Sequence, residues 1–325
     1  MRKIVEKNIT ILVPSRVYDN NLHLCITQIR NFYKNIKIFL VLDEPTNFKT
    51  DKNIKIIISG NKSIGFKRNL GVKYVRTKFV SFIDSDAYPK TEWLNDAINF
   101  FKDKAVAAVG GPNISPKTNN IEKILVARSR KNSIVTLNNK VKSRKTKKYF
   151  IDFLPSCNMI VRTKIYKKLN GMDPRLYSGE EVSLNYKINK NGFKMIFCPS
   201  IWVYHQDRNF KHFTRQRFIY GSTGLWLSLR YPCKESFMLF ISNFPLLYVL
   251  MFPIMFINKW IHLIYLSGIF LLISLILINS LKINFKNNFI KSLKLSLISI
   301  FIPGFGLLTS LFLKKEKIKE FYTQN

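Results

Sequence analysis

The sequence is poor in acidic residues. Its 325 residues include 19 Asp and Glu against 53 Lys and Arg, so the formal net charge is +34. We expect a protein this basic to meet an anionic partner, which is nucleic acid, a phosphorylated small molecule or an anionic membrane surface. Because 47% of the residues are apolar, the chain is not a disordered basic tail, since such segments have low hydrophobicity. The length predicts one large domain or two small ones.

Cysteine is also scarce. The chain has four, Cys25, Cys157, Cys198 and Cys233, and no two of them form a Cys-x-x-Cys pair. This spacing offers neither a disulfide framework nor a zinc site. We therefore expect four buried thiols in a reducing compartment.

Charge is absent altogether from three stretches of the C-terminal third, residues 237–257, 260–281 and 295–313. A helix needs about 20 residues to cross the hydrocarbon core of a bilayer, and each stretch has that length. We predict a membrane module over 236–313, followed by a basic tail, 314–325. Residues 1–235 hold 44 of the 53 basic and 17 of the 19 acidic residues, which is the composition of a soluble, basic domain.

Lysines suggest an orientation for this module. If the first helix leaves the cytoplasm and the second returns, the Lys-rich segment 282–294 lies inside, as the positive-inside rule prefers. The third stretch contains Pro303-Gly304 at its centre, so it is either a third span or a re-entrant hairpin. No signal peptide precedes the strand-like residues 9–13. We expect a multi-pass protein of the inner (plasma) membrane with its soluble domain in the cytoplasm.

The soluble part alternates strand-like and helical segments. Runs rich in Ile, Val and Phe lie at 9–13, 36–42, 54–59 and 79–83, and amphipathic segments of helical length lie at 22–33 and 65–75. This alternation predicts an α/β domain built on a parallel sheet. Ligands of such sheets bind beyond the carboxyl ends of the strands, so the residues that follow each strand are the candidates for a site.

Polar residues follow three of these strands. Pro14 and Ser15 follow the first, Asp43 follows the second, and Asp84-Ser85-Asp86 follows the strand at 79–83. Two carboxylates at i and i+2 can hold Mg²⁺ or Mn²⁺ between the protein and a phosphate. The pattern is weak alone, and a role as strand terminator is the alternative for Pro14.

A basic turn lies upstream of these carboxylates, at residues 65–71. It leads into a helix and suits the approach of an anionic ligand. The alternative for Lys67 and Arg68 is a solvated helix face.

The order of these motifs, completed by Gly179-Glu180-Glu181-x-x-Leu184, resembles the family 2 glycosyltransferases with the GT-A fold. The resemblance covers roughly residues 8–220. It implies a Rossmann-like nucleotide-diphospho-sugar transferase domain, followed here by transmembrane helices. The implied reaction moves a sugar from a UDP- or GDP-linked donor to an acceptor hydroxyl in one displacement, with inversion at the anomeric carbon. The acceptor would be a polysaccharide, a glycolipid or a lipid-linked intermediate.

The resemblance also implies roles for individual residues. Those assigned to the nucleotide sugar are Pro14, Ser15, Asp43, Arg68, Asn69, Asp84 and Asn158. Asp84 and Asp86 would hold the metal, Mg²⁺ or Mn²⁺, joined by His205, although a lone His is more often structural. Arg215 and Arg217 are placed either to clamp the diphosphate or to contact lipid headgroups.

Glu180 and Glu181 open a helical stretch. A carboxylate there also complements the helix dipole, so capping is an alternative. An inverting transferase needs a base to take the acceptor proton. Members of the family usually have Glu-Asp with the Asp as base, so we assign Glu181 as the base and keep Glu180 in reserve. Glutamate is one methylene longer, which bears on the geometry of attack.

The segment 123–148 has ten Lys or Arg and no acid. Stacking aromatics and nucleic-acid-binding motifs are missing from it, so we expect anionic lipid or a lipid-phosphate acceptor rather than nucleic acid. A solvated charge run is the alternative. Two other classes stay open for the whole chain, an inactive membrane-anchored scaffold with the same fold and a membrane-tethered nucleic-acid-binding protein. The sequence leaves the sugar, the base and the acceptor open.

Overall fold

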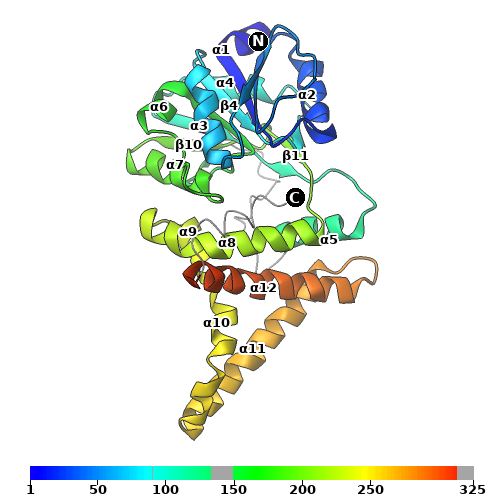
Figure 1. Cartoon of the computed structure of the whole chain (residues 1–325), viewed down its shortest axis with the longest axis vertical. Coiled ribbons are helices and arrows are strands. Elements are labelled where there is room, and N and C mark those ends of the chain that lie inside the picture. Colours follow the sequence, from blue (N-terminus) through cyan, green and yellow to red (C-terminus); the bar gives the residue numbers. More distant parts are fainter. Residues whose placement is uncertain (90, 133–148, 313–325) are drawn as a thin grey trace. The chain divides into compact units, whose positions relative to one another are not determined.

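The computed structural model describes residues 1–89, 91–132 and 149–312 (Figure 1). They form two compact units, and the described residues of the first lie within 1–116 and 149–206, those of the second within 117–132 and 207–312. The predicted boundary at residue 235 therefore moves to residue 206, because the long helix that follows belongs to the second unit. Most of the basic segment 123–148 and the tail 314–325 lie outside the described residues.

The first unit is built on a mixed sheet. Among the described residues, eight strands form it in the order β3-β2-β1-β4-β9-β6-β10-β8. The strands are β1 (Ile9–Pro14), β2 (Lys37–Leu42), β3 (Ile54–Ile58), β4 (Phe79–Ile83), β6 (Val106–Gly110), β8 (Tyr149–Phe150), β9 (Asn158–Arg162) and β10 (Lys194–Phe197).

The first four strands of this sheet are parallel, as predicted. Strands β1 and β4 are buried along their whole length, which explains why they are continuous apolar runs rather than alternating ones. Because these strands are parallel, their last residues lie at one edge of the sheet, for example Pro14 of β1, Leu42 of β2 and Ile83 of β4. The α/β fold predicted from the alternation of segments is confirmed.

The sheet is not parallel throughout, and β9 is the exception that shapes the site. It runs antiparallel between β4 and β6, with Ile83 opposite Asn158 and Phe79 opposite Arg162. The first residues of β9 therefore lie at the same edge as the last residues of β4. An apolar run does not reveal its direction, so the sequence predicted only a parallel sheet.

Helices cover both faces of the sheet. Buried side chains of α2 (Asn20–Phe32) and α4 (Trp93–Phe100) pack on one face with Ile11 and Val13. Those of α3 (Ile64–Tyr74), α6 (Thr163–Lys168) and α7 (Glu180–Lys190) pack on the other with Leu12. Figure 1 shows α2 on one side of the strands and α3, α6 and α7 on the other. The remaining helix, α1 (Arg2–Asn8), precedes β1.

A smaller sheet holds the turn after β4. It has the order β5-β11-β7, formed by β5 (Ala87–Tyr88), β11 (Val203–His205) and β7 (Asn113–Ile114). His205 lies opposite Ala87, and the backbone N–H of Gln206 donates to the carbonyl of Asp86 (3.0 Å). The small sheet thereby fixes His205 beside the Asp84-Ser85-Asp86 turn.

The second unit is helical. Its described elements are α5 (Ile121–Asn132), α8 (Phe210–Arg230), α9 (Lys234–Ile241), α10 (Phe244–Leu250), the short 3₁₀ helix η1 (Phe252–Phe256), α11 (Lys259–Ile283) and α12 (Phe289–Phe312). Within it α8 and α12 lie side by side, and α10 and η1 lead down to the start of α11 (Figure 1).

The structure changes two details of the predicted membrane module. The stretch 237–257 is not one helix but α9, α10 and η1, with Pro245 and Pro253 in the first positions of the last two. Proline is accepted there because the N–H it lacks has no helical partner. The third stretch has no re-entrant turn, since α12 continues through Pro303 and Gly304.

Helices α8 and α12 pack through small residues. A side chain at Gly221 would meet the backbone oxygen of Pro303 at 1.9 Å, and one at Gly306 would meet that of Phe218 at 2.0 Å. Only glycine allows this approach. Polar side chains join α11 to α12. Ser296 Oγ accepts one hydrogen bond from Asn279 Nδ2 (2.8 Å) and another from Ser280 Oγ (2.9 Å).

Two helices in the described part of the chain, α11 and α12, are long and apolar enough to cross a membrane. Over 18 residues, the mean hydropathy is 2.6 in α11 and 2.0 in α12. The large side chains of α11 face outward, for example Trp260, Ile264 and Phe270. This unit therefore places small and polar groups between α8, α11 and α12, beside a small buried apolar cluster that includes Phe210, Phe213 and Leu295, and exposes apolar groups on its outside.

Candidate active site

Two segments far apart in the sequence meet the turn after β4. The register of β4 with β9 brings the residues before Asn158 to Asp84, and the small sheet brings His205 to Asp86. Both carboxylates are about one-third exposed, whereas His205 is nearly buried. The structure therefore brings together the three predicted metal ligands at the edge where the parallel strands end.

These three side chains fit a divalent cation. His205 Nε2 lies 3.4 Å from Asp86 Oδ1 and 3.8 Å from Asp84 Oδ2. Adjacent ligand atoms of an octahedral Mg²⁺ or Mn²⁺ lie about 3 Å apart and opposite ones about 4 Å apart, given bonds of about 2.1 Å. The other ring nitrogen, Nδ1, is buried without a hydrogen-bond partner among the described residues. The distances from His205 to each of the two carboxylates therefore fall in the range that such a cation requires.

Cys157 is a neighbour that the sequence did not predict. Its Sγ, a carboxylate oxygen of Asp84 and a ring nitrogen of His205 all lie within 4.8 Å of one another. Cys157 was expected to be a buried structural thiol, and its place here follows from the antiparallel β9. The sequence would have placed Cys157 beside Asp84 only if it had shown that β9 is antiparallel to β4.

Arg68 joins this turn to the carboxylates of α7. Its Nη2 donates to Asp84 Oδ1 (2.7 Å) and its Nη1 donates to Glu180 Oε1 (2.6 Å). The side chain is 1% exposed, so the interpretation of Arg68 as part of a solvated helix face is wrong. Although burial disfavours its charge, Asp84 and Glu180 raise the pKa of Arg68. In the structure Arg68 bridges two carboxylates through ion pairs. Its contact with the nucleotide stays a prediction.

The adjacent carboxylate, Glu181, is held differently. Gly179 has a positive φ of 76° and precedes α7, so Glu180 and Glu181 both lie in its first turn. Glu180 pairs with Arg68, but Glu181 has no ion-pair partner among the described residues. Burial, and then the charge of Glu180, raise the pKa of Glu181 to about 8. A carboxyl group with such a pKa is a stronger base, once deprotonated, than an ordinary carboxylate, which fits the predicted base.

Lys67 organises the ends of β1 and β2. Its Nζ lies 2.6 Å from Asp43 Oδ1 and donates to the backbone oxygen of Ser15 (2.6 Å). The Lys67 side chain is 1% exposed, and burial lowers its pKa while the ion pair with Asp43 opposes that shift. Pro14, the last residue of β1, precedes this group. The predicted residues Ser15 and Asp43 are therefore linked by Lys67, and the alternative of a solvated helix face is wrong for this lysine.

The two predicted asparagines are engaged within the protein. Asn69 donates to the Met172 carbonyl (2.7 Å), and its Oδ1 accepts from the Tyr166 hydroxyl (2.6 Å) and the Met172 N–H (3.0 Å). These hydrogen bonds fix the segment before α7, so Asn69 has a structural role that requires no ligand. Asn158 donates to the Ile201 carbonyl (2.8 Å), and its buried Oδ1 has no partner in the described part of the chain.

The other predicted binding residues lie in the second unit. Arg215 and Arg217 are on α8, and Arg217 stacks on the rings of Phe213 and Tyr220. Burial lowers the pKa of Arg217. Their roles at diphosphate or lipid remain predictions.

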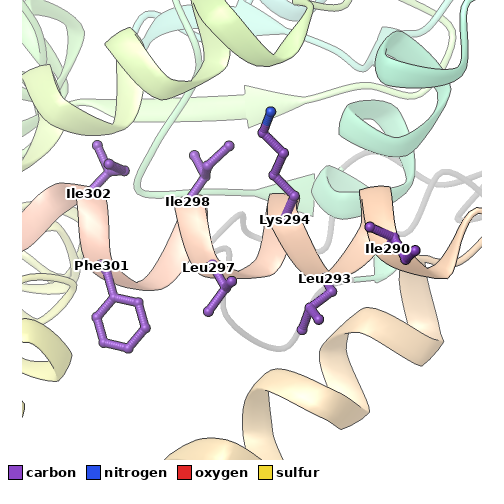
Figure 2. A pocket seen from close by; sticks show the side chains of 7 residues that line it. All are labelled: Ile290, Leu293, Lys294, Leu297, Ile298, Phe301 and Ile302. Atoms are coloured by element: carbon purple, nitrogen blue, oxygen red, sulfur yellow. The ribbon is translucent and has the colours of Figure 1, made fainter.

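A groove of about 470 Å³ also lies in the second unit, along α12 (Figure 2). Its lining consists of Ile290, Leu293, Lys294, Leu297, Ile298, Phe301 and Ile302. Lys294 is the one polar side chain among them, and carboxylates, histidine and cysteine are all missing from this lining. The groove therefore offers one ionisable group, the Lys294 amine, and no carboxylate, and the candidate reaction site is the cluster in the first unit.

Comparisons with known proteins agree with this geometry. The family model described as "Glycosyl transferase family 2" matches residues 10–169. "Pre-mycofactocin glycosyltransferase" from two strains of Mycobacterium tuberculosis is 23% identical over 247 residues, which cover 71% of this chain and 49% of the relative. The chain thus spans about half the length of these curated relatives.

A solved structure extends the likeness of the fold. "Mannosyltransferase PcManGT from Pyrobaculum calidifontis in complex with GDP-Man and Mn2+" has a TM-score of 0.58, with 94% of this chain and 87% of that chain covered at 11% identity. At this identity the likeness shows the fold alone, which is the GT-A fold.

Replacing Arg68 should destabilise the first unit. R68M leaves Asp84 and Glu180 without their buried partner, so we expect a loss of about 3 kcal/mol in the free energy of unfolding. The matched control is R2M, which removes the exposed pair of Arg2 with Glu92 and should cost less than about 1 kcal/mol. Chemical denaturation of the full chain measures both. Equal losses in the two variants would contradict the importance of the buried bridge.

Proposed function

Because the chain carries a family 2 glycosyltransferase domain over residues 10–169, we propose that it is an inverting glycosyltransferase. It moves a sugar from a UDP- or GDP-linked donor to an acceptor hydroxyl at the cytoplasmic face of the membrane. The observation that carries the proposal is the cluster of Asp84, Asp86 and His205, joined through Arg68 to the pair Glu180 and Glu181. A donor-side cation site and an acceptor-side base are the two parts that such a displacement needs.

The donor side is formed by the ends of β1, β2 and β4. Lys67 holds Asp43 and the Ser15 carbonyl in place, and we assign this end to the nucleoside. Asp84, Asp86 and His205 would hold Mg²⁺ or Mn²⁺. When bound there, such a cation would supply electrostatic stabilisation of the diphosphate leaving group. The Mn²⁺ complex of the mannosyltransferase with the same fold supports this assignment.

The acceptor side depends on Glu181. In a single displacement with inversion, the acceptor oxygen attacks the anomeric carbon as the bond to the diphosphate breaks, and the hydroxyl proton passes to the carboxylate. Glu180 is unsuited to this role, because its Oε1 accepts from Arg68 and its side chain is only 10% exposed. Arg68 therefore acts as a positioning residue that reserves Glu181 for the proton.

We further propose that the second unit is embedded in a lipid bilayer. Small residues between α8 and α12, and the polar contacts between α11 and α12, are the means by which helices associate in lipid. The outward side chains of α11 and the groove lining of α12 (Figure 2) are almost all apolar. In water such a surface would be a liability, whereas in lipid it costs nothing. An acceptor carried by a lipid fits this location.

Donor binding tests the main proposal. We expect one UDP- or GDP-sugar to raise the melting temperature of the purified full-length protein in the presence of Mn²⁺ and not in its absence, because a ligand that binds the folded state stabilises it. D86A should abolish the shift. D51A is the control, since Asp51 is an exposed residue that precedes β3 at the opposite edge of the sheet. A complete panel of nucleotide sugars without a metal-dependent shift would refute the proposal.

The pH dependence of transfer tests the base. Glu181 must be deprotonated to take the acceptor proton, so kcat/KM should rise with pH through the Glu181 pKa of about 8. E181Q should lower kcat by about 10² to 10⁴ while keeping the thermal shift with donor. E181D introduces the shorter aspartate that members of the family usually have, and its kcat should exceed that of E181Q. If E181Q were fully active, Glu181 would not be the base and Glu180 would be the candidate instead.

Cysteine labelling tests the membrane proposal. Asn258, between η1 and α11, and Asn287, between α11 and α12, are both exposed. If α11 crosses the bilayer, an impermeant maleimide added to intact cells should label N258C and not N287C, and inverted vesicles should show the reverse. Labelling of both positions from the same side would mean that α11 does not span.

A further inference from the structure

Cys157 stands at the candidate cation site without a role in the proposed reaction. The antiparallel register pairs Ile83 with Asn158, so the residue before Asn158 lies beside the residue after Ile83, which is Asp84. The donor atoms of Asp84, Cys157 and His205 lie within 4.8 Å of one another. A tetrahedral or octahedral cation with bonds of about 2.0 to 2.3 Å can reach all three after small side-chain adjustments.

The surroundings of this thiol resemble those of a metal-bound sulfur. The amide Nδ2 of Asn113 donates to Cys157 Sγ (2.8 Å). Asn113 belongs to β7, which pairs with β11, the strand that carries His205. Donors from outside the ligand set commonly orient metal ligands, and this one is fixed by the same small sheet as the histidine.

Other roles for Cys157 find less support. The thiol forms no disulfide, since all four cysteines are free. It is also only partly buried, unlike Cys25 and Cys198, which are core thiols. The unpartnered Nδ1 of His205, buried in the same cluster, shows that polar groups here are not fully satisfied by the protein.

We propose that Cys157 is a sulfur ligand of the cation held by Asp84, Asp86 and His205, and that it makes the site select Mn²⁺ and more thiophilic metals over Mg²⁺. The inference rests on the proposed function in that it uses the same cation site. Mg²⁺ is a hard ion that takes oxygen ligands, whereas later transition metals and Zn²⁺ accept nitrogen and sulfur. When the metal–sulfur bond forms, the thiol proton leaves to solvent.

Cd²⁺ provides a direct probe of the bond, because its thiolate complexes absorb in the ultraviolet. We expect Cd²⁺ added to the metal-free full-length protein to produce a charge-transfer band that C157S lacks. C198S is the matched control, because Cys198 is a buried thiol of the same unit, hydrogen-bonded to Ser200 (3.2 Å). This variant should keep the band, whereas D86A should weaken it together with metal affinity.

Metal preference provides the second measurement. Isothermal titration should show that C157S lowers the affinity for Mn²⁺ by about tenfold or more, which is the scale of effects at metal sites, while the affinity for Mg²⁺ changes little. The Mn²⁺/Mg²⁺ affinity ratio should therefore fall in C157S and stay unchanged in C198S. Melting of the metal-free variants checks that both remain folded.

The outcomes separate this inference from the proposed function. If the wild type binds Mn²⁺ through Asp86 but gives no band with Cd²⁺, or if C157S keeps the Mn²⁺/Mg²⁺ ratio, the sulfur ligand is refuted and the cation site stands. If D86A binds Mn²⁺ as the wild type does, the cation site itself fails. If the band is lost equally in C157S and C198S, Cd²⁺ binds thiols at random and the inference is also refuted.

Discussion

The buried guanidinium of Arg68 connects the two halves of the candidate active site. It donates to Asp84 on the donor side and to Glu180 on the acceptor side, and none of the three could be buried as a charged group alone without a large cost. The bridge therefore fixes α7 relative to β4. Glu181 has no such partner among the described residues, and burial followed by the charge of the adjacent Glu180 raises the pKa of Glu181.

A second constraint is the edge at which the strands end. Parallel strands β1, β2 and β4 bring their following residues to one side, and the antiparallel β9 adds its starting residues to the same side. The small sheet then closes the turn with His205. Oxygen, nitrogen and sulfur donors from three separate segments thereby meet at one point. This convergence is why a weak Asp-x-Asp pattern becomes a plausible cation site in three dimensions.

The second unit follows a different packing logic from the first. In the first unit apolar side chains fill two cores on either face of the sheet, as water requires. In the second, only a small apolar cluster is buried, glycine and hydrogen-bonded Asn and Ser lie between helices, and Trp260 and Phe270 face outward. Helices that associate in lipid gain nothing by burying apolar groups and rely on close contact instead. The second pattern is the one that the proposed bilayer location of this unit requires.

The sequence by itself determined the α/β class, the turn after β4 and the apolar C-terminal stretches, because strand runs, carboxylate spacing and missing charges are local patterns. It left open whether Lys67 and Arg68 meet a ligand or form a solvated helix face, and it did not reveal that both are 1% exposed and ion-paired, since their acidic partners Asp43 and Glu180 are distant in the chain. Only the tertiary structure decided these pairs, the break of residues 237–257 and the place of Cys157. Each depends on strand direction or on long-range packing, which a local pattern does not encode.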